Sequence, residues 1–221
     1  MTRLTPSPTT TPTEGQTAVA DTPVVFKRRT MDTVLISFGA VLAVALLVAG
    51  SLLTWGAGFS DDYVHDELAS QNITFPPAAA LEAEGRTDLL KYAGRDLTSG
   101  KQAEAYAGYI DGHLEDIADG ATYAELGTPE RESKAAVDAA KAEGAGEAQL
   151  AELQREADAI AGQRNTLFKG ETLRGLLLTA FAWSTVGSIA GYAAIAAFAA
   201  AAVMVVLVAL GIRHHHKVVT S

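Results

Sequence analysis

The sequence predicts an all-α membrane protein in which two transmembrane helices flank an extracytoplasmic helical domain, with a disordered tail at the N-terminus. Three observations carry this prediction. The first two are the uncharged apolar stretches Val34–Thr54 and Ile189–Ile212. A helix needs about 20 apolar residues to cross the hydrocarbon core of a bilayer, and each stretch reaches that length. The third observation is the middle of the chain, where apolar residues recur at helical spacing and no convincing strand alternation occurs.

The N-terminal tail is predicted to cover residues 1–30. Its stretch 1–23 is rich in Thr and Pro and contains few large apolar side chains. Such a segment cannot bury enough surface to offset the entropy lost on ordering, so we expect it to be disordered.

The first transmembrane helix is predicted over residues 31–56. A cleaved signal peptide is the competing interpretation, but its apolar core would be roughly 7–15 residues long and would lie close to the start of the chain. The stretch "LVAGS" at 47–51 is similar to a lipoprotein signal, except that Ser51 stands at the position of the lipidated cysteine. The chain contains no cysteine, which excludes that lipidation, disulfides, thiolate metal sites and a cysteine nucleophile.

The charges beside the two apolar stretches predict the orientation. Lys and Arg near the ends of transmembrane segments tend to stay cytoplasmic. "KRR" precedes the first stretch and "RHHHK" at 213–217 follows the second, whereas residues 57–172 carry 23 Asp and Glu against 10 Lys and Arg, a net charge of −13. We therefore expect a cell-membrane protein with both termini in the cytoplasm and the middle outside.

The C-terminal apolar region is divided into three parts. Residues 172–186 are predicted to form an amphipathic helix at the outer surface, residues 187–212 the second transmembrane helix, and residues 213–221 a cytoplasmic tail. The alternative is a tight hairpin with a turn near Ser184–Ser188. It would cross the membrane twice and place Arg174 and several Gly, Ser and Thr residues in the first crossing. That composition favours one crossing.

The extracytoplasmic domain, residues 57–171, is expected to be helical. Ser60 is a candidate N-cap, Pro76–Pro77 should break the chain, and residues 101–119 show the clearest amphipathic stripe. Thr128 followed by a proline suggests another helix start. Between Leu150 and Leu167 the apolar spacing matches heptads interrupted by Arg164, which favours a helical hairpin packed on residues 101–119 over a coiled coil.

Histidines and carboxylates supply the candidate metal ligands. Asp62, His65 and Asp66 would share one face of a helix, where imidazole and carboxylate groups suit a divalent ion. The simpler interpretation is a solvated acidic first turn that complements the helix dipole. His113 falls on the apolar stripe, either as a satisfied or partly exposed interior histidine or as a ligand or pH-sensing group. The three histidines at 214–216 either form a cationic membrane-proximal end or bind metal.

Gly187, Gly191 and Ala194 give the second span a small-residue face that allows close approach of another helix, either the first span or a partner. No phosphate-binding loop, nucleophile elbow or zinc-protease motif occurs, and the acidity of the domain argues against nucleic acid. We expect no cofactor and no enzymatic activity. The expected role is an accessory or interaction protein that contacts the lipid bilayer and another membrane or envelope protein, or a second copy of itself. The alternative is an extracytoplasmic metal or ligand sensor.

Three stretches carry a resemblance to a family: "ITFPP", "QAEAYAGYIDGHLEDIADGATYAEL" and "LFKGETLRGLLLTAFAWSTVG". With them the chain resembles uncharacterised actinobacterial integral membrane proteins that have an anchored extracytoplasmic helical domain. The resemblance covers about a third of the chain and implies the topology and a bacterial origin, without an activity or catalytic residues.

Overall fold

The computed structural model describes residues 28–219, and it describes side chains over residues 30–214. The predicted tail at residues 1–30 therefore lies almost wholly outside the described residues, as do the side chains of His215 and His216. Within the described part the chain forms helices and one isolated β-bridge between Thr74 and Asp96. The elements are α1 (Arg28–Ser70), α2 (Ala78–Ala83), the 3-10 helix η1 (Thr87–Tyr92), α3 (Gly100–Ile117), α4 (Gly127–Ala142) and α5 (Glu147–Val219). The all-α class is confirmed for this part.

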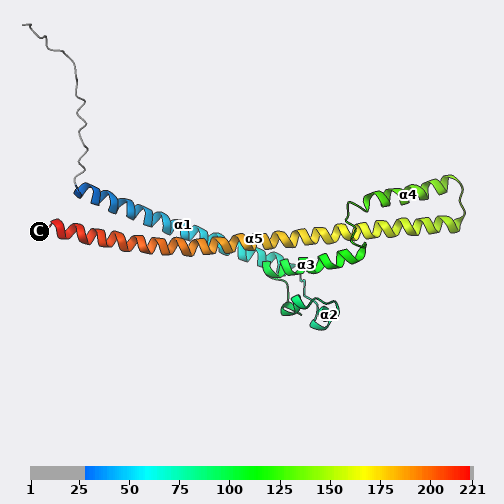
Figure 1. Ribbon diagram of the computed structural model, residues 1–221, viewed down its shortest axis with the longest axis horizontal. Coiled ribbons are helices and arrows are strands. Elements are labelled where there is room, and N and C mark those ends of the chain that lie inside the picture. The colour runs from blue at the N-terminus through cyan, green and yellow to red at the C-terminus, as the bar shows by residue number, and fades with distance from the viewer. Residues whose placement is uncertain (1–27, 220–221) are drawn as a thin grey trace, which may run out of the picture.

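Helices α1 and α5 form a long antiparallel pair (Figure 1). Both are long and apolar enough to cross a membrane. Their register is visible at three glycine contacts: a Cβ placed on Gly39 would lie 2.9 Å from Val208, one on Gly50 would lie 2.9 Å from Phe198, and one on Gly187 would lie 2.9 Å from Ser60. The backbones approach closely because these positions have no side chain.

The contact between α1 and α5 repeats every seven residues. The buried or half-buried positions at this spacing are Ile36, Ala43, Gly50, Ala57 and Val64 on α1 and Gly187, Ala194, Ala201 and Val208 on α5. We call this line of contact between α1 and α5 the seam. When the contact positions recur strictly every seven residues, the seam rotates slowly around each helix, and the two helices form a left-handed supercoil. Most of these side chains are small, as at helix interfaces in membranes, where close backbone packing replaces the hydrophobic effect.

The remaining elements pack around the half of α5 that precedes residue 187. Helix α3 lies against α5, where Gly100 contacts Ser184 and Gly170 contacts Leu114. Helix α4 folds back along the first turns of α5, and Gly144 in the connection adopts a φ of +72°, which a residue without a Cβ tolerates. Figure 1 shows α4 and the beginning of α5 projecting as a hairpin beyond α3. We call residues 127–172 the arm.

A small lobe formed by α2 and η1 completes the domain. Its buried side chains form one cluster with side chains from α1, α3 and α5, and the members larger than alanine are Val64, Leu68, Phe75, Leu81, Leu89, Leu97 and Leu177. The antiparallel bridge at Thr74–Asp96 closes the lobe at its base. Helix α2 begins directly after Pro77, where the sequence predicts a break.

Two predicted helix starts are wrong. Ser60 does not cap a new helix, because α1 runs through it and its hydroxyl donates a hydrogen bond of 2.7 Å to the carbonyl of Trp183 across the seam. Helix α4 begins at Gly127 after Leu126, so Thr128 is already inside it. The helix expected over residues 101–119 is confirmed as α3. Ser99 caps this helix, because its side chain accepts a hydrogen bond from the backbone N–H of Gln102.

Residues 172–186 are a part of α5 and are continuous with the apolar segment that follows. The helix does not turn near Ser184–Ser188, so the hairpin alternative lacks the turn that a second crossing requires. Leu177 is buried in the domain core, and Arg174 is paired with Asp111 and Glu171 at 3.3 and 3.2 Å. The boundaries expected at 56/57 and 186/187 both fall inside unbroken helices.

The seam yields a stability prediction. Gly187→Leu should lower the free energy of unfolding by about 1–3 kcal/mol, because a side chain added there overlaps Ser60 and must push α1 away. Gly175→Leu is the matched control, since a Cβ on Gly175 meets no atom within 4 Å. Unfolding monitored by circular dichroism in a mild detergent measures both. Equal stability of the two variants would contradict the packing of α1 on α5.

Candidate interaction surface

An exposed aromatic ladder marks one end of the apolar segment of α1. The rings of Trp55 and Phe59 are stacked with centroids 5.8 Å apart, and those of Phe59 and Tyr63 are stacked at 6.1 Å. The ladder follows from a spacing of four residues, which places the side chains one above another on a helix. Trp183 of α5 is level with it, because the Trp183 carbonyl accepts the Ser60 hydrogen bond. Trp and Tyr are enriched where a membrane meets water, since each has an apolar body and a polar tip.

Aromatic rings join the core of the α2–η1 lobe to α3. Phe75 lies edge-on to Tyr106 of α3 with ring centroids 5.2 Å apart and is tilted against Tyr92 at the same distance. Burial raises the pKa of Tyr106 above its usual range. These contacts fix the lobe on α3.

Polar contacts between the lobe and α3 gather at Tyr109. Its hydroxyl donates to Glu84 at 3.4 Å, and the guanidinium of Arg86 lies 5.8 Å from its ring centre. Burial, and secondarily the Glu84 carboxylate, raise the pKa of Tyr109. Arg86 donates to the Gly108 carbonyl at 3.0 Å and pairs with Asp88, whose pKa it lowers through the hydrogen bond.

His113 belongs to this polar edge and not to the buried stripe. Its side chain is 52% exposed, its Nδ1 lies 3.0 Å from the Tyr109 carbonyl, and its Nε2 lies 3.9 Å from a Glu84 oxygen. The place expected for His113 on the apolar stripe is therefore wrong, and of the expected states partial exposure agrees with the structure. The helical periodicity places it beside the stripe, one residue before the buried Leu114.

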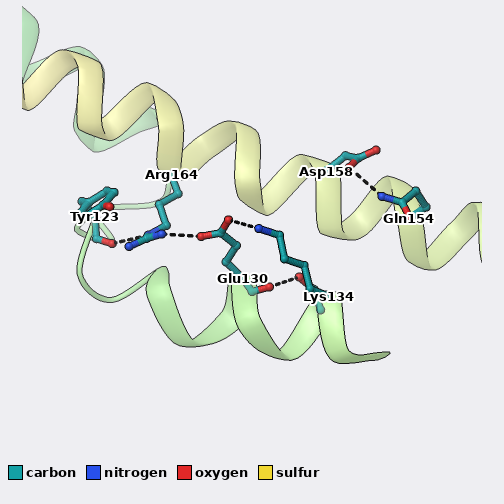
Figure 2. A network of polar contacts seen from close by, with 7 residues as sticks. Tyr123, Glu130, Lys134, Gln154, Asp158 and Arg164 are labelled. Carbon is teal, nitrogen blue, oxygen red and sulfur yellow. Dashed lines mark hydrogen bonds and ion pairs between the residues drawn. The ribbon is translucent and has the colours of Figure 1, made fainter. Parts of the chain in front are cut away.

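A charged network joins α4 to α5 inside the arm (Figure 2). Arg164 donates to Glu130 at 2.6 Å and to the Tyr123 carbonyl at 3.2 Å, and its guanidinium lies 4.0 Å from the centre of the Tyr123 ring. Lys134 donates to the other Glu130 oxygen at 2.6 Å. The hydrogen bonds from Lys134 and Arg164 lower the pKa of Glu130. Arg164 is thus a specific clamp between the two helices of the arm, with a planar group that suits both a carboxylate and a ring.

The candidate metal ligands Asp62, His65 and Asp66 lie on exposed positions of α1 close to its C-terminal end. They do not form an acidic first turn, because α1 begins many turns earlier, at Arg28. Among the residues that the structure describes, no three His, Asp or Glu side chains gather closely enough to hold a metal ion. The geometry gives no metal centre here.

The small-residue face of α5 is covered by α1. Gly187 lies against Ser60, a Cβ on Gly191 would lie 3.8 Å from the Cβ of Ala57, and Ala194 is 3% exposed. Of the two uses that the sequence left open for this face, the structure shows the contact with the first apolar helix. This face is therefore not open to another protein.

Comparisons with protein families, with curated proteins and with solved structures found no match for this chain. The inference of function therefore depends on the geometry of the chain itself. Two features that bear on it were missed in the sequence. In the sequence Arg164 only interrupts the heptads, because its contact with the Glu130 carboxylate depends on how two separate helices pack. The aromatic ladder can be recognised in the sequence, because Trp55, Phe59 and Tyr63 are spaced four residues apart.

The Arg164 clamp gives a prediction for the dynamics of the arm. Arg164→Met should speed amide hydrogen exchange in α4, because Glu130 loses its partner on α5 and the two helices separate more often. Arg155→Met is the matched control, since Arg155 pairs with the exposed Glu152 on α5 alone. Unchanged exchange in α4 of Arg164→Met would show that apolar contacts suffice to fix the arm.

The same clamp should respond to pH. The pKa of Glu130 is lowered from its ordinary value of 4.5 in the folded chain, so its stabilisation is fully present above that value and is lost as the pH falls through the lowered pKa. Protection of α4 amides in the unmodified chain should therefore decrease over that acidic window, and Glu130→Gln should remove this pH dependence. Hydrogen exchange measured across the window, corrected for the intrinsic pH dependence of exchange, tests both expectations.

Proposed function

We propose that this protein is a membrane-anchored, non-enzymatic accessory protein whose extracytoplasmic helical domain binds a membrane or envelope partner through the arm. The observation that carries the proposal is the unbroken α5. One helix joins the apolar segment to the arm, so the arm is held at a fixed direction and distance from the membrane.

Exposure of the apolar segments supports the membrane anchor. In the most apolar windows of α1 and α5, 17% and 6% of the residues are buried. The core helix of a soluble protein would be mostly buried, whereas a helix in a bilayer exposes apolar side chains to lipid. The aromatic ladder and Trp183 then lie at the outer headgroup level, and the exposed acidic residues of α1 begin at the same level, at Asp61 between Phe59 and Tyr63.

Charge supports the orientation. The arginines at the start of α1 and Arg213 near the end of α5 lie at the same end of the pair. The opposite end carries the domain with its net charge of −13. With the basic end in the cytoplasm, the domain lies outside the cell membrane.

The form of the arm supports a binding role. Residues 147–172 of α5 extend the helix by about 39 Å at 1.5 Å per residue. One side of each helix in the arm is buried, at Val137 and Ala140 of α4 and at Ala157 of α5. Closer to the domain, Leu167 of α5 is buried against Leu114 of α3 and Ala118. The opposite sides are solvent-exposed and carry mixed charges, a surface suited to selective protein contacts in which complementary charge sets specificity.

The orientation has a direct test. Ala148→Cys at the start of α5 should react with a membrane-impermeant maleimide in intact cells, and Thr11→Cys should react only after the membrane is opened. The natural chain contains no cysteine, so each variant reports a single site. The reverse labelling pattern would refute the topology.

The binding role is tested by site-specific photocrosslinking in intact cells. A benzoylphenylalanine at the exposed position 152 should give discrete adducts with another envelope protein. The same group at position 157, which faces α4, should crosslink only within the chain. A second variant with Glu152→Lys and Glu156→Lys should weaken capture by a probe at position 148 if charge guides the contact. Absence of discrete adducts from several exposed arm positions would refute the proposal.

A further inference from the structure

A groove lies between α1 and α5 at the level of the α2–η1 lobe. It has a volume of about 300 Å³ and is lined mainly by apolar side chains of residues 63–73 and 173–183. Val64, Leu68 and Leu177 are buried and form its floor. Leu176 and Trp183 stand at its edge with 64% and 53% of their surface exposed.

The groove exists because α5 stays apolar for longer than α1. The uncharged run of α1 covers positions 33–60, and the longer uncharged run of α5 covers positions 175–212. The start of the α1 run and the end of the α5 run lie at the same level, since a Cβ on Gly211 would lie 3.0 Å from Ile36. The excess length of the α5 run therefore extends about 15 Å past Ser60, at 1.5 Å per residue. There it faces the acidic end of α1, and its apolar side chains are only partly covered.

The position of the groove decides what can enter it. On the membrane placement proposed above, on which this inference rests, the groove begins directly outside the headgroup level marked by Tyr63 and Trp183. An acyl chain from the outer leaflet reaches it by moving along α5, without crossing water. A partner helix is about 10 Å wide with its side chains, whereas the volume here is that of a small-ligand site, for which about 300 Å³ is the lower end of the usual range.

Charge selects the headgroup. Glu67 is the one charged side chain that lines the groove. Its surroundings are acidic, because residues 57–126 carry 14 Asp and Glu against 4 Lys and Arg. Arg174, the nearest cation along α5, is already engaged by Asp111 and Glu171. An anionic head would therefore be repelled, and an amine would pair with the Glu67 carboxylate.

We propose that this groove binds one acyl chain of an amphiphile with an amine headgroup. The chain lies on Leu177 between α1 and α5, and the amine lies beside Glu67. The site gives the helical domain a means of sensing or carrying a membrane amphiphile in addition to its protein partner. Occupation would also cover the exposed apolar edge at Leu176 and Trp183.

The test uses the full chain in phosphatidylcholine nanodiscs with a photoreactive dodecylamine and, as its pair, a photoreactive dodecyl phosphate. The amine should label peptides of residues 63–73 and 173–183, and excess unreactive dodecylamine should abolish this labelling. Labelling of the lipid-facing parts of the spans should persist under the same competition. Labelling of the groove that is not saturable, or equal for the two headgroups, would overturn the proposal.

Two variants sharpen the result. Leu176→Arg should reduce groove labelling about tenfold or more, because a charged group in an apolar site is costly to desolvate. Leu178→Arg, which replaces a leucine outside the groove, is its control. Glu67→Lys should reverse the preference from dodecylamine to dodecyl phosphate, and Glu132→Lys on α4 should leave it unchanged. Failure of Glu67→Lys to change the preference would overturn the assignment of the headgroup.

The outcomes also separate this inference from the proposed function. Resistance of the same chain to carbonate extraction reports membrane insertion independently. An inserted chain whose groove is not labelled refutes the amphiphile site alone, whereas a chain that is extracted refutes the anchor. Adducts between residue 176 and a neighbouring protein helix would show that a protein occupies the groove and would overturn the amphiphile assignment.

Discussion

The close antiparallel contact of α1 with α5 is the constraint on which the other features depend. The contact repeats every seven residues and is built from residues as small as glycine at Gly39, Gly50 and Gly187. Dispersion forces between closely approaching backbones are what remains to hold two helices together when the solvent is as apolar as their side chains. Because the register is fixed along the whole pair, the levels of the aromatic ladder, the groove and the domain core are fixed with it.

The continuity of α5 distributes three contacts along one helix. Its first part packs on α4, its middle packs on α3 and the lobe, and its last part packs on α1. In an arrangement of separate helices each connection would absorb small shifts between parts. Here a rotation of the last part about the seam changes the direction of the arm, since no loop lies between them. The seven-residue seam resists such a rotation, because small residues would be replaced at the interface by larger neighbours.

The sequence predicts the helical class, the two apolar helices and the position of α3, because each depends on periodicity and composition within a short window. It predicts the break near Pro77 for the same reason. The expectation for Ser60 is wrong for a different reason. Ser60 is a good capping residue locally, yet α1 continues through it, and its hydroxyl donates instead to the carbonyl of Trp183, far along the chain.

Arg164 shows the same limit for the candidate interaction surface. Within an apolar heptad pattern, an arginine is read as an interruption. Arg164 links α5 to α4 only because the fold brings Glu130 and Tyr123 next to it. The groove cannot be predicted from the sequence either, since it depends on the register of two helices whose uncharged runs differ in length. The exposed aromatic ladder can be predicted from the sequence, because a spacing of four residues on one helix is a local property.

The hydrogen bond between Ser60 and Trp183 joins residues 123 positions apart, and this separation has a consequence for biogenesis. In the proposed topology, α1 enters the bilayer during synthesis long before α5 exists, so its glycine-lined face would have no partner while the domain between the two helices is translocated and folded. Contacts between such distant segments form late, after the local helices. Until then, in that topology, the nascent chain would be a single-span intermediate with an open packing face, a form suited to recognition by the insertion machinery and, if synthesis stops early, by quality-control proteases.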